Sequence, residues 1–224
     1  MTTKTQKNEK LFLTLATILA VTVIAPLVTT QAYAYDCSYD HCYAVAYKSV
    51  DNLGGYAEIN INSGNYVSSS YGIWNPVWVG FSTNEWLEGG WQKGTGATPC
   101  DSISANFYTW MNVDTPYSGT CVGSVSGSTV TIQISDTNED GYWGILVNGY
   151  QEDTYHNEAT AISVSTGGES SNENNVLDNG RSQSLEYADT NGDWNFWDSA
   201  TLEQDASYTA SWNTQYTDLA YEGP

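Results

Sequence analysis

The sequence predicts an all-β protein, an antiparallel sandwich of two sheets with a jelly-roll-like architecture. Segments in which apolar and polar residues alternate recur along the chain, and clusters of Gly, Asn, Asp and Ser separate them. No window after residue 34 has the period of an amphipathic helix. The 9 Trp and 17 Tyr also favour strands. Many short strands joined by polar turns are typical of a sandwich or a barrel.

The alternating segments are the expected strands, and they occupy residues 56–62, 77–82, 107–113, 128–135, 142–149, 160–166, 194–202 and 208–215. The segment WLEGGWQKG, residues 86–94, alternates as well. One face would carry Trp86, Glu88, Gly90 and Gln92, and the other Leu87, Gly89 and Trp91. The polar, Asn- and Ser-rich segment from Gly167 to Ser184 predicts a long loop.

The first 34 residues predict a secretory signal peptide, which leaves residues 35–224 as a single secreted β-sandwich domain. Three lysines precede the apolar run of residues 11–28, and Ala32 and Ala34 occupy the small-residue positions of a cleavage site. The run is nearly long enough to span a bilayer, so the alternative is a retained N-terminal anchor, which would be the protein's only membrane contact.

The charge of the chain excludes two classes of partner. After residue 34 the sequence has 25 acidic residues against only Lys48, Lys93 and Arg181, so the net charge is about −22. A protein this acidic repels nucleic acids and anionic membranes. We therefore expect neither as a partner, and we expect a monomer.

The four cysteines predict two disulfides, because an even number in an exported protein is usually paired. Three pairings are possible. We favour Cys37–Cys42, which closes a tight N-terminal loop, and Cys100–Cys121, which would link both flanks of the aromatic segment FYTWMNV.

Several kinds of chemistry have no support in the sequence. His41 lies close to two cysteines and His156 in a polar turn, and neither has a recognisable nucleophile beside it. No His/Cys spacing resembles a zinc site, and there is no P-loop or dinucleotide motif, so we expect no cofactor. The segment from Asp136 to Gly141 matches the first half of a calcium loop, but Val147 stands where the loop needs Glu, so a plain turn is favoured.

Three segments together resemble the core of the glutamic peptidases, in their eqolisin and neprosin branches. These are VWVGFSTNEWLEGGWQKG (77–94), NFYTWMNVDTPYSGTC (106–121) and GSTVTIQISD (127–136), and the resemblance extends from Trp78 to Gly149. LEGGW is similar to the neprosin strand that carries a catalytic Glu. The resemblance implies a concanavalin-like fold and a secreted, acid-acting endopeptidase that cleaves polypeptides without metal.

The resemblance also implies the site residues. Glu88 stands where the eqolisins have a catalytic Gln and the neprosins a catalytic Glu. Its partner would be Glu169, in a matching GGE context, or less favourably Glu186 in SLEYAD. One carboxyl group must be ionised to accept a proton from water, and the other must be neutral to stabilise an oxyanion. The substrate groove would be lined by Trp78, Trp91, Gln92, Tyr108 and Trp110.

Two other classes of function stay open on the sequence alone. Glu88 could be a surface acid of a non-catalytic carbohydrate-binding or cell-surface module, because exposed Trp and Tyr rings also stack on sugars. A glycosidase also uses two carboxyl groups, about 5–9 Å apart across a sugar-sized cleft. A peptidase requires Glu88 and its partner to converge in one cleft, whereas a binding module requires a flat aromatic strip without such a pair.

Overall fold

The structure is a computed structural model that describes residues 41–62, 64–67, 70–112, 117–136, 138–173, 175–205 and 207–223. These residues belong to one compact unit, Tyr33–Pro224. They form fifteen β-strands and, within the described ranges, no helix. The predicted all-β fold is therefore confirmed. The segment expected to be a signal peptide lies outside the described residues.

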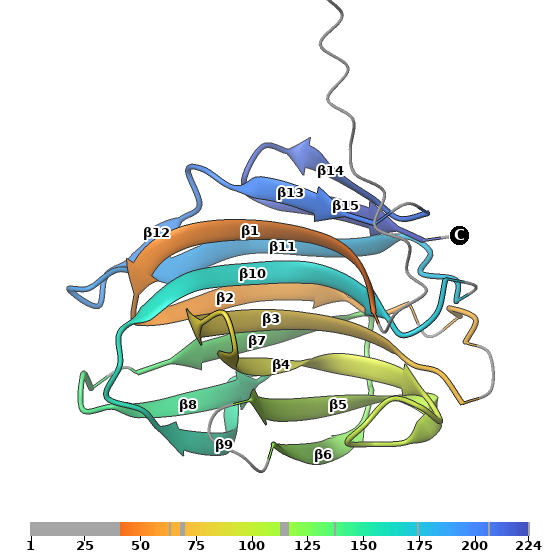
Figure 1. Cartoon of the computed structure of the whole chain (residues 1–224), viewed down its shortest axis with the longest axis horizontal. Coiled ribbons are helices and arrows are strands. Elements are labelled where there is room, and N and C mark those ends of the chain that lie inside the picture. The colour runs from red at the N-terminus through yellow and green to blue at the C-terminus, as the bar shows by residue number, and fades with distance from the viewer. Residues whose placement is uncertain are drawn as a thin grey trace, which may run out of the picture. The chain divides into compact units, whose positions relative to one another are not determined.

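Two antiparallel sheets make up the fold (Figure 1). The first sheet has the order β13-β1-β10-β3-β4-β5-β6, with β13 (Thr201–Gln204), β1 (Cys42–Asn52), β10 (Ala161–Ser170), β3 (Ile73–Ser82), β4 (Glu85–Gly94), β5 (Ser102–Asn112) and β6 (Ser118–Ser124). The second has the order β14-β15-β11-β2-β7-β8-β9, with β14 (Thr209–Thr214), β15 (Asp218–Glu222), β11 (Gly180–Ala188), β2 (Gly54–Asn60), β7 (Thr129–Ser135), β8 (Tyr142–Val147) and β9 (Tyr150–His156). The short β12 (Trp194–Phe196) pairs with β11.

The hydrophobic core lies between the two sheets, and alternation decides which side chains enter it. On β4, Leu87 and Trp91 are buried in the core cluster, and Gly89 on the same face lies against the second sheet. A Cβ added at Gly89 would come within 2.8 Å of Ile145 Cγ2 of β8. The odd-numbered face of β4 is therefore the core face, and the even-numbered face, which carries Glu88, points away from the second sheet.

The expected strands all contain β-structure, but several expected loops do as well. The predicted strand 194–202 is two strands, β12 and β13, that pair in different sheets. The turn expected around His156 is the end of β9. The prediction missed β1, β6, β9, β11 and β15, although the sequence of β1, CYAVAYKSVDN, alternates.

The predicted loop from Gly167 to Ser184 is wrong at both ends, because β10 continues to Ser170 and β11 begins at Gly180. The glycines that predicted a loop are instead required by close packing inside a strand. A Cβ at Gly168 would lie 2.0 Å from Leu177 Cδ2 and 2.8 Å from the ring of Tyr221. Only the shorter connection between the two strands is loop.

The disulfide between Cys100 and Cys121 is present, as predicted, with a Cα–Cα distance of 4.8 Å. Cys121 is the register partner of Tyr108, so the bond ties β6 to β5 beside that tyrosine. Cys42 is also disulfide-bonded. Its expected partner, Cys37, lies outside the described residues, and that pairing stays a prediction. In the described part of the chain, no helix is long and apolar enough to cross a membrane.

Candidate active site

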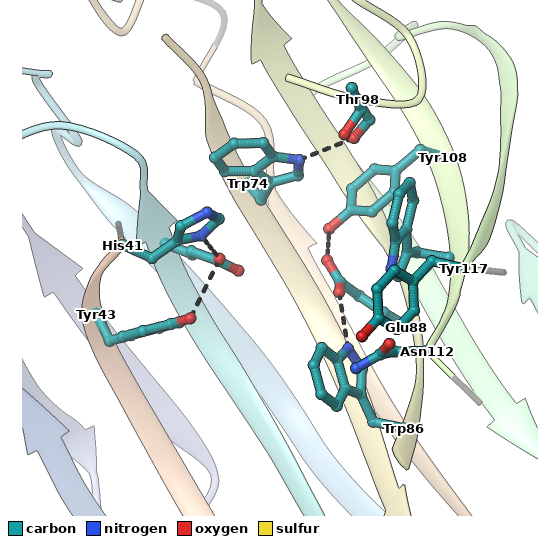
Figure 2. Close-up of a pocket in the computed structure, with 11 residues that line it drawn as sticks. His41, Tyr43, Trp74, Trp86, Glu88, Thr98, Tyr108, Asn112 and Tyr117 are labelled. Atoms are coloured by element: carbon teal, nitrogen blue, oxygen red, sulfur yellow. Dashed lines mark hydrogen bonds and ion pairs between the residues drawn. The ribbon is translucent and has the colours of Figure 1, made fainter. Parts of the chain in front are cut away.

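A pocket of about 600 Å³ opens on the face of the first sheet that points away from the core (Figure 2). Two carboxyl groups, those of Glu88 and Glu169, line it together with His41 and a set of aromatic side chains. The aromatic residues come from β1, β3, β4, β5 and the position just before β6, and they are Tyr43, Trp74, Trp86, Tyr108, Trp110 and Tyr117.

The register of the first sheet explains why these residues meet. Glu88 of β4 lies opposite Trp78 of β3 and Trp110 of β5. Glu169 of β10 lies opposite Trp74 of β3 and Tyr43 of β1. Trp74 and Trp78 have the same parity on β3, so the two rows of side chains share one face of the sheet. The row between them contains Gly90, where an added Cβ would lie 2.3 Å from the backbone oxygen of Asn75, so the close approach of β3 and β4 requires glycine there.

Glu88 is buried, with a relative exposure of 6%, and three uncharged groups donate hydrogen bonds to it. The Tyr108 hydroxyl donates to Oε1, and the Trp86 indole donates to Oε2 at 3.3 Å. The third donor is the indole of Trp78. Burial and the negative charge of Glu169 outweigh these donors and raise the pKa of Glu88 to about 8. Glu88 therefore holds its proton at neutral pH.

Glu169 has a different environment, although its exposure of 7% is similar. His41 Nδ1 and the Tyr43 hydroxyl both contact its Oε1, the hydroxyl at 3.4 Å. The His41 ring stacks on Trp74, with 5.3 Å between centroids (Figure 2). In the described parts of the chain, no hydrogen-bond donor reaches Oε2 of Glu169.

The two tyrosines in these contacts keep their protons. Burial and the nearby carboxylates raise the pKa of both Tyr43 and Tyr108, because a phenolate beside a carboxylate in a buried site is strongly disfavoured. They act only as donors to the two acids. The site thus combines a neutral carboxyl group with a second carboxyl group that has a histidine beside it, and such a pair shares one proton.

Four of the residues proposed from the sequence come together here: Glu88, Glu169, Tyr108 and Trp110 all line the pocket. Trp78 does not line it, but it contacts Glu88 as a hydrogen-bond donor.

Three proposed residues lie elsewhere. Trp91 is 1% exposed in the core, where its indole donates to the Asn60 carbonyl, because it lies on the opposite face of β4 from Glu88. Gln92 shares the face of Glu88 but is buried, with Nε2 donating to the Ala97 carbonyl. Glu186 belongs to β11 of the other sheet, in a separate depression with Tyr56 and Glu58.

Sequence reasoning missed the residues that complete the pocket around Glu169, above all His41, Tyr43 and Trp74. His41 carries no catalytic motif and contacts a residue 128 positions away. The alternation of CYAVAYKSV would have identified β1, but not its position beside β10.

The described residues contain no cluster of three or more His, Cys, Asp or Glu side chains suited to hold a metal ion. At the calcium-like segment, the Asp136 carboxylate accepts hydrogen bonds from the backbone N–H groups of Asp140 (3.2 Å) and Gly141 (2.8 Å). Both of its oxygens thus bind backbone N–H groups of the turn itself.

No protein-family model matches the sequence, and no curated protein matches it either. The structure, however, is similar to solved peptidases. The chain superposes on scytalido-glutamic peptidase with a transition state analog inhibitor at a TM-score of 0.60 and 12% identity, over 83% of this chain and 99% of the peptidase. A second structure of that enzyme, with a peptide-based transition state analog, gives 0.59, 12% and the same coverage.

SCP-B, described as a member of the eqolisin family of peptidases and solved with the tripeptide Ala-Ile-His, gives a TM-score of 0.57 at 11% identity, again over 83% of this chain and 99% of that one. At these identities the likeness establishes the fold. The protein therefore has the fold of the glutamic peptidases, as the resemblance in its sequence indicated.

Proposed function

We propose that this protein is a secreted, metal-independent glutamic endopeptidase in which Glu169 and Glu88 form the catalytic pair. The observation that carries the proposal is the convergence of these two buried acids on one aromatic-lined pocket. Its fold is shared with peptidases that were solved with a transition state analog or a tripeptide. A binding module would not need two buried, electrostatically coupled carboxyl groups at the centre of its aromatic surface.

In the proposed reaction, Glu169 is the general base. Its Oε2 accepts a proton from water, and the water oxygen forms a bond to the peptide carbonyl carbon. The carbonyl π electrons move to the carbonyl oxygen, and the protonated Glu88 stabilises the developing oxyanion by donating a hydrogen bond. The C–N bond then breaks as the leaving nitrogen takes the proton held by Glu169. Glu88 keeps its proton throughout.

The roles are assigned from the two environments. Glu88 is the group with a raised pKa, so it is the natural donor, and a donor is useful only while it holds its proton. Glu169 has Oε2 without a donor from the described residues, so this oxygen is available to water. Trp74, Trp86 and Trp110 would hold the substrate on either side of the bond to be cleaved.

The secreted protein, incubated with an unfolded polypeptide over a range of pH, tests this function. We expect cleavage at acid pH that declines as Glu88 ionises, and no loss of activity in a chelator. Glu169→Gln should be inactive, because an amide accepts no proton from water. Glu186→Gln is the matched control on the other sheet and should retain activity. A wild-type protein that cleaves no polypeptide at any pH would overturn the proposal in favour of a binding module.

A further inference from the structure

We propose that His41 is a positioning residue of this site, whose imidazolium holds Glu169 ionised and fixes its Oε1, so that Glu169 is the base and Glu88 the hydrogen-bond donor to the oxyanion. The inference rests on the proposed peptidase function and adds a third residue, from outside the pair of acids, that decides which acid takes which role.

The first argument is the contact itself. His41 Nδ1 meets Oε1 of Glu169, and the Tyr43 hydroxyl reaches the same oxygen at 3.4 Å. Both contacts therefore occupy one oxygen of the carboxylate, which leaves Oε2 without a donor from the described residues. A hydrogen bond between an imidazolium and a carboxylate is charge-assisted and about twice as strong as a neutral one.

The second argument is that the His41 ring is held in place. It stacks on Trp74 with an interplanar angle of 18°, and the Trp74 indole in turn donates to the Thr98 carbonyl at 3.2 Å. Cys42, the next residue, is fully buried at the start of β1 and disulfide-bonded. The side chain of His41 is nevertheless 38% exposed, so the ring exchanges protons with solvent.

The third argument is the balance of charge in the pocket. Among the described residues, the titratable groups around His41 are Glu169 of β10, Tyr43 of β1, Glu88 of β4, Tyr108 of β5 and Tyr117, with Asp205 bonded to the Tyr43 backbone N–H at 2.7 Å. None of them is a cation.

The other three cationic side chains of the described residues lie away from the pocket lining. Lys48 pairs with Asp198 and Arg181 with Asp218, and Lys93 donates to the Asn65 carbonyl. His41 is thus the side chain among the lining residues that can become positive.

These observations assign the shared proton. Two coupled carboxyl groups hold one proton between them, and in equal surroundings either group could carry it. A positive charge beside Glu169 favours its ionised form, whereas Glu88 has only uncharged donors and is buried. The proton therefore resides on Glu88. Without the charge of His41, the fraction of molecules with the productive arrangement falls.

The direct test uses the fact that the chain has only two histidines, His41 and His156. NMR of the imidazole nitrogens follows both rings through a pH titration in the wild-type protein and in Glu169→Gln. We expect the titration midpoint of His41 to fall by about one pH unit or more in the variant, because it loses its carboxylate partner. His156, 4.6 Å from the Tyr142 ring on the other sheet, serves as the internal reference. An unchanged His41 midpoint would overturn the inference.

The functional test compares the pH profiles of kcat/KM for His41→Asn and for the matched control His156→Asn. Asparagine keeps a hydrogen-bond donor but cannot become charged. Loss of a charge-assisted hydrogen bond should reduce kcat/KM roughly 10- to 100-fold. The acid limb of the profile should also move toward neutral pH, because the carboxylate in the pocket loses its positively charged neighbour. A merely structural role would lower the rate without moving the limb.

The outcomes separate this inference from the proposed function. An active wild-type protein whose His41→Asn profile matches that of His156→Asn overturns the role of His41 and leaves the peptidase function standing. A wild-type protein without peptidase activity at any pH overturns both. A displaced acid limb together with a displaced His41 midpoint supports the role of His41 in this reaction.

Discussion

Glu88 and Glu169 lie on strands that do not pair with each other, and the charge of one raises the pKa of the other across the strand between them. β3 separates β4 from β10, and the two acids stand opposite different tryptophans of that strand, Trp78 and Trp74. The coupling therefore depends on the register of three strands. A slip of one residue in β3 would turn both tryptophans to the core face and disperse the site.

The first prediction concerns stability and pH. The pKa of Glu88 is raised from 4.5 to about 8, first by burial and then by Glu169. A raised folded-state pKa means that the unfolded chain releases this proton first, so Glu88 adds no penalty below about pH 4.5 and lowers stability progressively as pH rises toward 8. Urea unfolding should show that the wild type loses more stability than Glu88→Gln between pH 5 and pH 8. Parallel curves for the two proteins would contradict the raised pKa.

A second prediction concerns Tyr108, whose hydroxyl donates to Glu88 and lowers its pKa. Removing that hydroxyl in Tyr108→Phe should raise the pKa of Glu88 further, so the alkaline limb of the kcat/KM profile should move to higher pH. Tyr150→Phe is the matched control, because Tyr150 is 74% exposed on β9 of the other sheet. A limb that moves to lower pH in Tyr108→Phe would mean that this hydroxyl does not stabilise the carboxylate.

A third prediction concerns the disulfide between Cys100 and Cys121, which closes a segment of 21 residues. Replacing both cysteines with Ser should lower the free energy of unfolding by about 3 kcal/mol, the value expected from loop-closure entropy for a loop of this length. The pairing of Tyr108 with Cys121 also predicts a functional effect, because β6 is released beside the donor to Glu88. Chemical denaturation of the oxidised protein and the double Ser variant measures the difference, and equal midpoints would contradict it.

Much of the fold could be predicted because alternation is a local property. β4 shows this well: the pattern of WLEGGWQKG separates Glu88 from Leu87 and Trp91, and the structure has the same two faces. The prediction that Trp91 lines the groove was wrong. The alternation of β4 already puts Trp91 on the core face, opposite Glu88. The loop predicted from Gly167 was wrong over residues 167–170, which belong to β10. Glycines that close packing requires inside a strand have the same local sequence pattern as a turn, so the sequence alone does not distinguish the two.

The candidate site could be predicted only in part. Glu88 and Glu169 were identified through short motifs around each acid, which the sequence carries locally. The sequence did not indicate a role for His41, because its contact with Glu169 depends on β1 pairing with β10, and strand order is a property of the whole chain. Glu186 could not be excluded from the sequence for the same reason, because only the strand order shows that β11 belongs to the second sheet.

The last prediction uses Glu88 to separate the two roles in the proposed catalytic pair. If Glu88 donates a hydrogen bond to the oxyanion, Glu88→Gln should retain measurable activity, because an amide also donates. Glu88→Ala should lose about 10²–10³ in kcat, the typical effect of removing one oxyanion donor. The Gln variant should also lack the alkaline limb that Glu88 produces as it ionises.

The same two substitutions at Glu169 complete the comparison, because a general base is replaced by neither Gln nor Ala. Both Glu169 variants should therefore be inactive, whereas the two Glu88 variants should differ from each other. Rates on an unfolded polypeptide, measured for all four proteins after their folding is checked by circular dichroism, decide the assignment. Equal loss of activity in Glu88→Gln and Glu88→Ala, with activity retained in Glu169→Gln, would reverse the roles. Full activity in Glu88→Ala would remove Glu88 from the mechanism, since a buried carboxyl group that donates to the oxyanion cannot be deleted without a loss of rate.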